Sequence, residues 1–148
     1  MNNKVVLAYS GGLDTSYCVK YLTEEKKLDV YAITVNTGGF SDEQLTAIET
    51  RAKELGVKNF IVKDVVKEYY EKCIQYLIFG NVLKNNTYPL SVSAERVFQA
   101  IAVAEYAKEI GADYIAHGST GAGNDQVRFD MVFNIVMPEA TIITPIRD

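Results

Sequence analysis

The sequence predicts an α/β fold, a doubly wound parallel sheet of five strands in the order 3-2-1-4-5. Three observations predict it: short β-branched apolar runs, helical stretches between them, and glycine-rich turns that follow two of the runs. The apolar runs are nearly continuous, which is typical of strands buried on both faces. Strands that alternate with helices through right-handed crossovers build such a sheet, so the 148 residues are expected to form one domain.

Five segments have the length and composition of buried strands. They are residues 5–9, 30–35, 60–62, 114–116 and 142–143. In the expected order the first and fourth strands are neighbours, and the direction of winding reverses between them. Ligands of doubly wound sheets bind at such a switch point, beyond the carboxyl ends of the strands.

Five helical stretches connect the strands. They are expected from near residue 14 through 22, from 41 to 55, from about 66 to 79, from about 93 to 110, and from 125 to 136. The second has the clearest start, because Ser41 and Gln44 form a capping box. Gly56 and Gly111 offer left-handed stops. Residues 80–90 are expected to form one long irregular stretch, which is often where function lies.

Composition and charge exclude several classes of protein. With 10 Gly, 3 Pro and 2 Cys, the chain is neither collagenous, nor disordered, nor a disulfide framework. The formal net charge of −4 lacks the basic excess of a duplex-binding domain, so no nucleic-acid partner is expected. No apolar run approaches the roughly 18 residues that span a membrane, and no secretion signal is visible. A cytoplasmic protein without a membrane partner is therefore expected.

The turn after the first strand has the features of a phosphate-binding loop. It reads Ala8-Tyr9-Ser10-Gly11-Gly12-Leu13-Asp14-Thr15-Ser16 and opens the first helix. The two glycines permit a positive φ, and the first helical turn presents free amides at the positive end of the helix dipole. The string matches neither the Walker A nor the Rossmann motif. Without a lysine, the phosphate charge must be met by the amides, by basic groups from elsewhere, or by a metal for which Asp14 is a candidate ligand. The alternative is an ordinary turn capped by Asp14 or Thr15.

The turn after the fourth strand predicts an amino-acid pocket. Residues 116–128 combine three glycines with Thr120, Asn124, Asp125 and Arg128. Arg128 offers a fork for a carboxylate, and Asp125 suits an ammonium group. The alternative is a glycine-rich turn in which Asn124 or Asp125 caps the next helix and Arg128 lies in solvent.

Taken together, the two loops resemble the argininosuccinate synthase family, which is one of the N-type ATP pyrophosphatases. The first resembles the PP-loop of the N-type ATP pyrophosphatases, and residues 117–129 resemble the second signature of the argininosuccinate synthase family. The resemblance spans the whole chain but covers only the N-terminal domain of the family. It implies that residues 1–148 are one nucleotide-binding PP-loop domain with an adenine nucleotide alpha hydrolase-like fold. The synthetase and C-terminal oligomerisation regions of a longer protein, a homotetramer in this family, would then lie outside the chain.

The resemblance also implies an activity, that of an ATP-dependent carbon–nitrogen ligase of arginine biosynthesis. The ureido oxygen of citrulline attacks the α-phosphate of ATP and releases pyrophosphate. The amine of aspartate then displaces AMP from the citrullyl-adenylate and gives argininosuccinate. ATP and Mg²⁺ are the implied cofactors, and a domain without its synthetase region is expected to be catalytically incomplete.

Each matching residue takes an expected role from the resemblance. The residues expected at ATP are Ala8, Tyr9, Ser10, Gly11, Gly12, Leu13, Asp14, Thr15, Ser16, Val35 and Gly118. The residues expected at citrulline are Tyr88, Ser93, Asn124 and Arg128, and those expected at aspartate are Thr120, Asn124 and Asp125. Asp14 and Asp125 are the expected catalytic residues, and the metal ligands stay open.

The chain departs from the family in three places. The family segment Gly-Thr-Ser-Leu-Ala-Arg-Pro is here Ser91-Val92-Ser93-Ala94-Glu95-Arg96-Val97. Ala122 replaces a frequent Lys, and Val35 replaces a smaller Ala. The first change leaves Ser93 less secure as a citrulline residue than Arg128, the second removes one basic contact to phosphate, and the third tightens the slot for adenine.

Three further residues have structural interpretations. His117 is the only histidine, which excludes a His-rich metal site, and it is expected to hydrogen-bond the loop at the end of its strand. Cys18 and Cys73 lie on predicted helices and are expected to be small packing residues instead of nucleophiles.

Two other functions stay open. One is a PP-loop enzyme that adenylates a tRNA base, which usually needs a catalytic Cys pair or a basic RNA-binding surface, and neither is visible. The other is a nucleotide-binding sensor without catalysis, in which Asn124, Asp125 and Arg128 would have no substrate.

Overall fold

The computed structural model describes residues 3–147, without the side chains of Lys84, Tyr88 and Pro89. Its centre is a parallel sheet in the order β3-β2-β1-β6-β7. The strands are β1 (Lys4–Ala8), β2 (Asp29–Asn36), β3 (Asn59–Asp64), β6 (Tyr114–Ala116) and β7 (Thr141–Ile143). The predicted fold class, the five strands and their order are confirmed.

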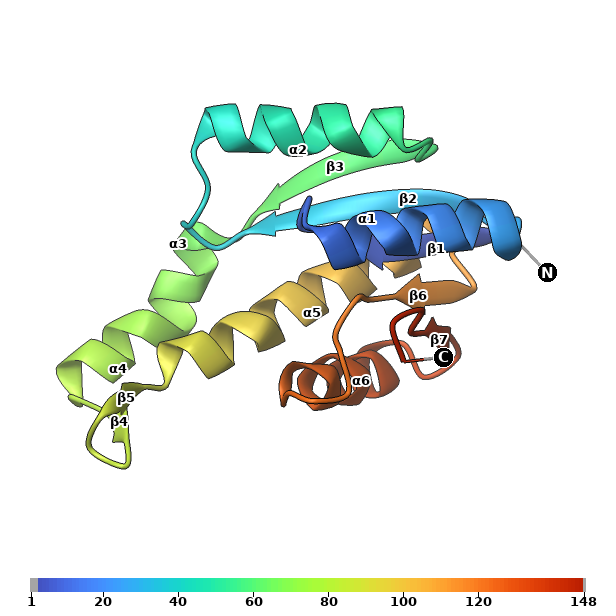
Figure 1. The fold of residues 1–148 in the computed structure, drawn as a ribbon. Coiled ribbons are helices and arrows are strands. Elements are labelled where there is room, and N and C mark those ends of the chain that lie inside the picture. The colour runs from blue at the N-terminus through green and yellow to red at the C-terminus, as the bar shows by residue number, and fades with distance from the viewer. Residues whose placement is uncertain (1–2, 148) are drawn as a thin grey trace.

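Helices cover both faces of the sheet, as Figure 1 shows. On one face lie α1 (Leu13–Lys20) and α2 (Asp42–Glu54), and on the other lie α5 (Ser91–Ile110) and α6 (Asp125–Val136). Each face has its own apolar core, and the sheet separates the two. The result is the three-layer arrangement that near-continuous apolar strands require, because such strands must be covered on both sides.

The side chains of strand β1 pack alternately into the two apolar cores. Successive side chains of a strand point to opposite faces. Val6 therefore packs with Phe133 against α5 and α6, while Val5 and Leu7 pack with Leu22 on the side of α1. Because Val5, Val6 and Leu7 are each covered by one core or the other, no polar residue interrupts this run.

The helix boundaries follow the predicted capping signals. Ser41 N donates to Gln44 Oε1 over 2.9 Å, and Gln44 N donates to Ser41 Oγ over 3.3 Å, so the capping box of α2 is formed. Gly56 and Gly111 adopt φ values of 92° and 63° behind α2 and α5. Each glycine stops its helix in a conformation that costs other residues more.

Two helices contain π turns that the sequence pattern did not predict. After α1 the chain continues as η1 (Tyr21–Glu25). The third predicted helix consists of α3 (Val66–Tyr69), the π segment η2 (Tyr70–Ile74) and α4 (Gln75–Phe79). The segment η1 ends the first helix, and η2 has α-helix on both sides. Each spans five residues, which is too short for apolar spacing to reveal.

The stretch of residues 80–90 is not irregular throughout, so that prediction was wrong in part. It forms a short antiparallel hairpin from β4 (Leu83–Lys84) and β5 (Tyr88–Pro89). Asn85 and Asn86 turn the chain with φ values of 54° and 58°, which asparagine tolerates better than most residues. Strands of two residues are too short to leave a pattern in the sequence.

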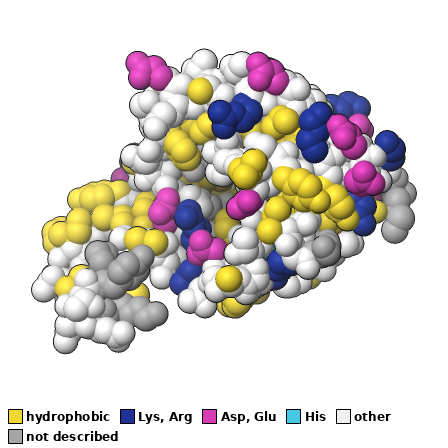
Figure 2. Space-filling view, in the orientation of Figure 1, with side chains coloured by type: hydrophobic (Ala, Val, Ile, Leu, Met, Phe, Trp, Pro, Cys, Tyr) yellow, Lys and Arg dark blue, Asp and Glu magenta, His cyan; other side chains and the backbone are white. Residues whose placement is uncertain are grey.

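The hairpin and the helices α3 and α4 form an arm that extends from one end of the sheet (Figure 1). Hydrophobic side chains cover much of this arm on the face drawn in Figure 2. Tyr76, Ile78 and Phe79 are among its exposed side chains. Between residues 3 and 147, no helix is both long enough and apolar enough to cross a bilayer.

Candidate functional site

A cleft of about 550 Å³ lies beyond the carboxyl ends of β1, β2 and β6, with one wall formed by α5. This is the switch point at which the sequence placed a ligand. The predicted site residues that line it are Ala8, Tyr9, Ser10, Gly12, Leu13, Asp14, Thr15, Val35, Gly118, Thr120 and Asp125. Gly11, Ser16, Ser93, Asn124 and Arg128 do not line the cleft itself, and the side chain of Tyr88 lies outside the described part of the chain.

The first turn of α1 presents backbone amides to the cleft. Gly12 is the N-cap residue in an extended conformation, and no side chain caps the helix. The amides of Leu13, Asp14 and Thr15 therefore have no partner within the helix, and all three residues line the cleft. The alternative, in which Asp14 or Thr15 caps the helix, is wrong, because Gly12 is the N-cap residue, no side chain accepts a capping bond, and Thr15 Oγ1 donates to Gly12 O over 3.2 Å. An anion is favoured at this position.

Helix α2 supports the same turn from behind. Gly11 adopts a φ of 75°, and its carbonyl accepts a hydrogen bond of 2.5 Å from Arg51 Nη1. A Cβ at Gly11 would lie 2.8 Å from Ile48 Cγ1. Gly11 thus shapes the turn and faces α2, whereas its neighbour Gly12 faces the cleft. The sequence did not point to Arg51 or Ile48, because both look like ordinary residues of an amphipathic helix.

The two glycine-rich loops lie against each other. A Cβ at Gly118 would be 3.3 Å from Thr15 Cγ2 and 3.4 Å from Cys18 Sγ. The loop after β6 therefore passes directly over the first turn of α1, and a larger residue would push the two apart. Cys18 lies beneath this contact, where burial raises the pKa of its thiol to about 12. It is a packing residue, as expected, because a thiol with that pKa carries almost no thiolate at neutral pH.

Asp125 lies between two arginines. Its Oδ2 accepts from Arg96 Nε over 3.1 Å, and its Oδ1 accepts from Arg128 Nη1 over 2.8 Å. Arg128 Nη2 also donates to Ser93 Oγ over 3.1 Å. The alternative in which Arg128 lies in solvent is wrong. Asn124 is the N-cap residue of α6, yet its side chain makes no capping bond.

A second polar group lies on the wall formed by α5 and was missed by the sequence reasoning. Glu95 Oε1 accepts from Thr37 Oγ1 over 2.7 Å and from Gln99 Nε2 over 3.2 Å, and Gln99 Oε1 accepts from Arg96 Nη1 over 2.9 Å. Figure 2 shows side chains of both charges next to one another over α5 and beside α6. Glu95, Gln99 and Val103 share a helix face at intervals of four, which was the available signal.

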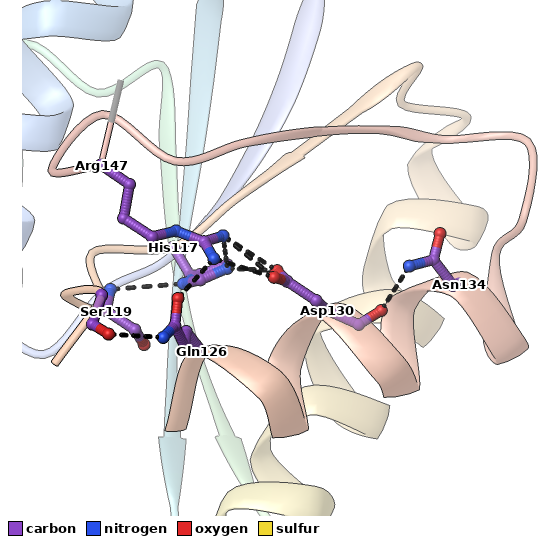
Figure 3. A network of polar contacts seen from close by, with 7 residues as sticks. His117, Ser119, Gln126, Asp130, Asn134 and Arg147 are labelled. Atoms are coloured by element: carbon purple, nitrogen blue, oxygen red, sulfur yellow. Dashed lines mark hydrogen bonds and ion pairs between the residues drawn. The ribbon is translucent and has the colours of Figure 1, made fainter. Parts of the chain in front are cut away.

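His117 is the centre of a network that fixes the loop after β6 (Figure 3). Its side chain is 1% exposed, and Nδ1 accepts from Ser119 N over 3.2 Å. Since a backbone amide can only donate, Nδ1 carries no proton, and Nε2 donates to Asp130 Oδ1 over 2.8 Å. Burial lowers the pKa of His117 despite the neighbouring Asp130 carboxylate. The expected loop-bonding role is confirmed.

Arg147 extends this network to the segment after β7. Its guanidinium donates to both carboxylate oxygens of Asp130 over 3.0 and 3.2 Å, and to Gln126 Oε1 over 2.7 Å. Gln126 Nε2 in turn donates to Gly121 O over 2.7 Å. The network thus ties the glycine-rich loop to α6 and to the chain beyond β7. Neither Asp130 nor Arg147 was predicted.

No cluster of three or more His, Cys, Asp or Glu side chains suitable for a metal ion occurs in the described residues. Asp14 is the one predicted metal-ligand candidate, and it lies alone in the first turn of α1, at the cleft. Magnesium in phosphate-transfer sites is commonly held by one or two carboxylates and by the phosphates of the substrate. The arrangement fits an ion that arrives with a nucleotide better than an ion held by the protein alone.

A family model described as the argininosuccinate synthase N-terminal HUP domain matches residues 4–148. Curated relatives named argininosuccinate synthase include those of Dehalococcoides mccartyi, 45% identical over 99% of this chain, and Pyrobaculum aerophilum, 41% identical over 98% of it. The chain spans 36% of the length of these relatives.

Solved structures with the same fold include two nucleotide-related synthetases. An NH₃-dependent NAD synthetase from Campylobacter jejuni gives a TM-score of 0.60 at 16% identity, over 81% of this chain and 48% of that one. An NMN synthetase from Francisella tularensis gives 0.61 at 11% identity, over 80% of this chain and 46% of that one. At such identities the likeness supports the fold alone.

Proposed function

The chain belongs to the argininosuccinate synthase family, whose N-terminal HUP domain it matches, and on that premise we propose that it is the nucleotide-binding part of an argininosuccinate synthase. The whole enzyme would be an ATP-dependent ligase that joins citrulline to aspartate through a citrullyl-adenylate, in the cytoplasm and without a nucleic-acid or membrane partner. The observation that carries the proposal is the uncapped first turn of α1, which faces the cleft beside the group of Asp125, Arg128 and Ser93.

The first turn of α1 would hold the polyphosphate of ATP. The amides of Leu13, Asp14 and Thr15 are aligned by the helix and need no rearrangement to meet an anion. Preorganised donors of this kind stabilise charge as it develops on a leaving pyrophosphate. Magnesium bound with the nucleotide would neutralise part of that charge, and Asp14 is the residue that would face it. Val35, which is buried at the end of β2, would contact the adenine.

The amino-acid substrates would bind where the cleft meets the group of Asp125, Arg128 and Ser93. Arg128 would take the carboxylate of citrulline, with Ser93 bonded to it and Asn124 on the same helix, and Asp125 with Thr120 would face the ammonium of aspartate. Tyr88 is proposed at citrulline on the resemblance alone. Both oxygens of Asp125 are occupied by arginines, so a substrate carboxylate would compete with Asp125 for Arg128. Little acid–base power is needed, because positioning of the ureido oxygen against the α-phosphate accounts for most of the rate.

The polar group around Asp125 argues against the two alternatives. A nucleotide sensor has no need for two arginines and a serine next to its nucleotide, and the net charge of −4 gives a tRNA-modifying enzyme no basic excess.

The proposal is tested by titrating the isotope-labelled chain with Mg-ATP and then with citrulline, while amide spectra are recorded. We expect ATP to shift the amides of residues 12–16 and Gly118, and citrulline to shift those of Ser93 and Arg128. Citrullinamide, which lacks the carboxylate, serves as the matched control and should not bind. Binding of ATP without any response to citrulline would favour the sensor instead, and binding of tRNA in place of citrulline would favour the modifying enzyme.

A further inference from the structure

Glu95 has no role in the proposed reaction, yet it lines the cleft. It lies on the α5 wall, and it stands where the family segment quoted above has an alanine. Its carboxylate is anchored to Thr37, the residue that follows β2, and to Gln99 one turn further along α5. The anchoring places a negative charge at the end of the second strand of the sheet.

Oε1 of this carboxylate accepts two hydrogen bonds, and Oε2 accepts none from the described residues. Both hydrogen bonds that Glu95 makes with the described residues fall on Oε1, and its nearest ion-pair contact, with Arg96 Nη1 at 3.9 Å, is also measured to Oε1. The side chain is 30% exposed. Glu95 lines the cleft, and Oε2 keeps its acceptor capacity on a side chain that two donors already hold through Oε1.

The position of Glu95 indicates which ligand group would meet it. In the Rossmann class of doubly wound sheets, which has a different first loop, an acidic residue near the end of the second strand accepts a hydrogen bond from a ribose hydroxyl. The pair formed by Thr37 and Glu95 lies at that place. Glu95 is bonded to the chain that leaves β2, whereas Asp125 and Arg128 belong to α6, and Arg96 of α5 donates through Nε to Asp125.

We propose that Glu95 accepts hydrogen bonds from the ribose hydroxyls of the bound nucleotide, and that this contact makes the cleft select ribonucleotides. The inference rests on the proposed function, because it requires a nucleotide in the cleft. A hydrogen bond to a charged acceptor changes affinity by roughly tenfold or more. Thr37 and Gln99 act as positioning residues that hold the carboxylate in place.

The test compares dissociation constants for ATP and 2′,3′-dideoxy-ATP, which lacks both hydroxyls, in the wild-type chain and in Glu95→Ala. The wild-type chain should bind ATP about tenfold more tightly than the dideoxy nucleotide, and the ratio should fall below about twofold in Glu95→Ala. The ratio cancels any general gain in affinity that comes from removing a negative charge near the phosphates. Glu109→Ala, which removes an exposed carboxylate from the same helix, should keep the wild-type ratio.

Three results would overturn the inference. If Glu95→Ala binds ATP and keeps the wild-type ratio, the ribose contact is wrong while the proposed nucleotide site stands. If Glu95→Ala alters the preference for ATP over ITP and leaves the ribose ratio unchanged, Glu95 contacts the base. If the wild-type chain binds no ATP, the proposed function fails, and the inference fails with it. Circular dichroism of each variant checks that it is folded.

Discussion

The two adjacent glycines of the first loop should respond to alanine in opposite ways. Gly11 has a φ of 75°, and a Cβ there would lie 2.8 Å from Ile48 Cγ1. A left-handed conformation costs an alanine about 1–2 kcal/mol, and overpacking against Ile48 adds about 1–2 kcal/mol. Gly12 has a φ of −78°, and its Cβ would meet only Ser10 Oγ at 3.5 Å, so the fold should accept Gly12→Ala.

Thermal unfolding and nucleotide titration separate the two effects. For a chain of this size, 2–4 kcal/mol should lower the melting temperature of Gly11→Ala by roughly 5–15 °C. Gly12→Ala should melt within about 2 °C of wild type, yet it should bind ATP several-fold more weakly, because its methyl group enters the cleft beside the first-turn amides. Equal melting temperatures for Gly11→Ala and wild type would refute the strain at Gly11. Unchanged ATP affinity in Gly12→Ala would refute the placement of the phosphates.

Three further predictions concern the rest of the site. Arg128→Ala should weaken citrulline binding at least tenfold and leave ATP binding within about twofold, as measured by titration, and equal losses would count against the assignment. Because burial holds the pKa of His117 below its ordinary 6.5, the unfolded chain takes up the proton more readily. The free energy of unfolding should therefore fall as the pH drops below about 6.5, by up to about 1.4 kcal/mol per pH unit, and His117→Asn should flatten that slope in urea unfolding. Finally, the 148-residue chain alone should produce no argininosuccinate from ATP, citrulline and aspartate in a product assay, since it spans 36% of the length of its relatives. Detectable synthesis would contradict the expectation that this domain is catalytically incomplete.

Local sequence patterns predicted most of the fold. The near-continuous apolar runs identified all five strands of the sheet, because a strand covered on both faces buries most of its side chains. The order of the strands followed from the resemblance and from the alternation with helices. The π segments η1 and η2 and the hairpin of β4 and β5 were not predicted, because segments of five residues and strands of two residues are too short to show in an apolar pattern.

The features of the site that are local in the chain were predicted, and the contacts between different elements were not. The first loop was predicted because its glycines and its helix start are neighbours in the chain. The contacts of Glu95 with Thr37 and of His117 with Asp130 and Arg147 were not predicted, because each joins different elements and depends on how those elements pack. A glutamate on a helix is usually solvated, and only the anchoring hydrogen bonds distinguish Glu95 from such a residue.

The most direct test of the account is a crystal structure of the chain with ATP bound. We expect oxygens of the triphosphate to lie within hydrogen-bond distance of the amides of Leu13, Asp14 and Thr15. A triphosphate bound anywhere else, or a first turn of α1 closed by protein side chains in the complex, would contradict it.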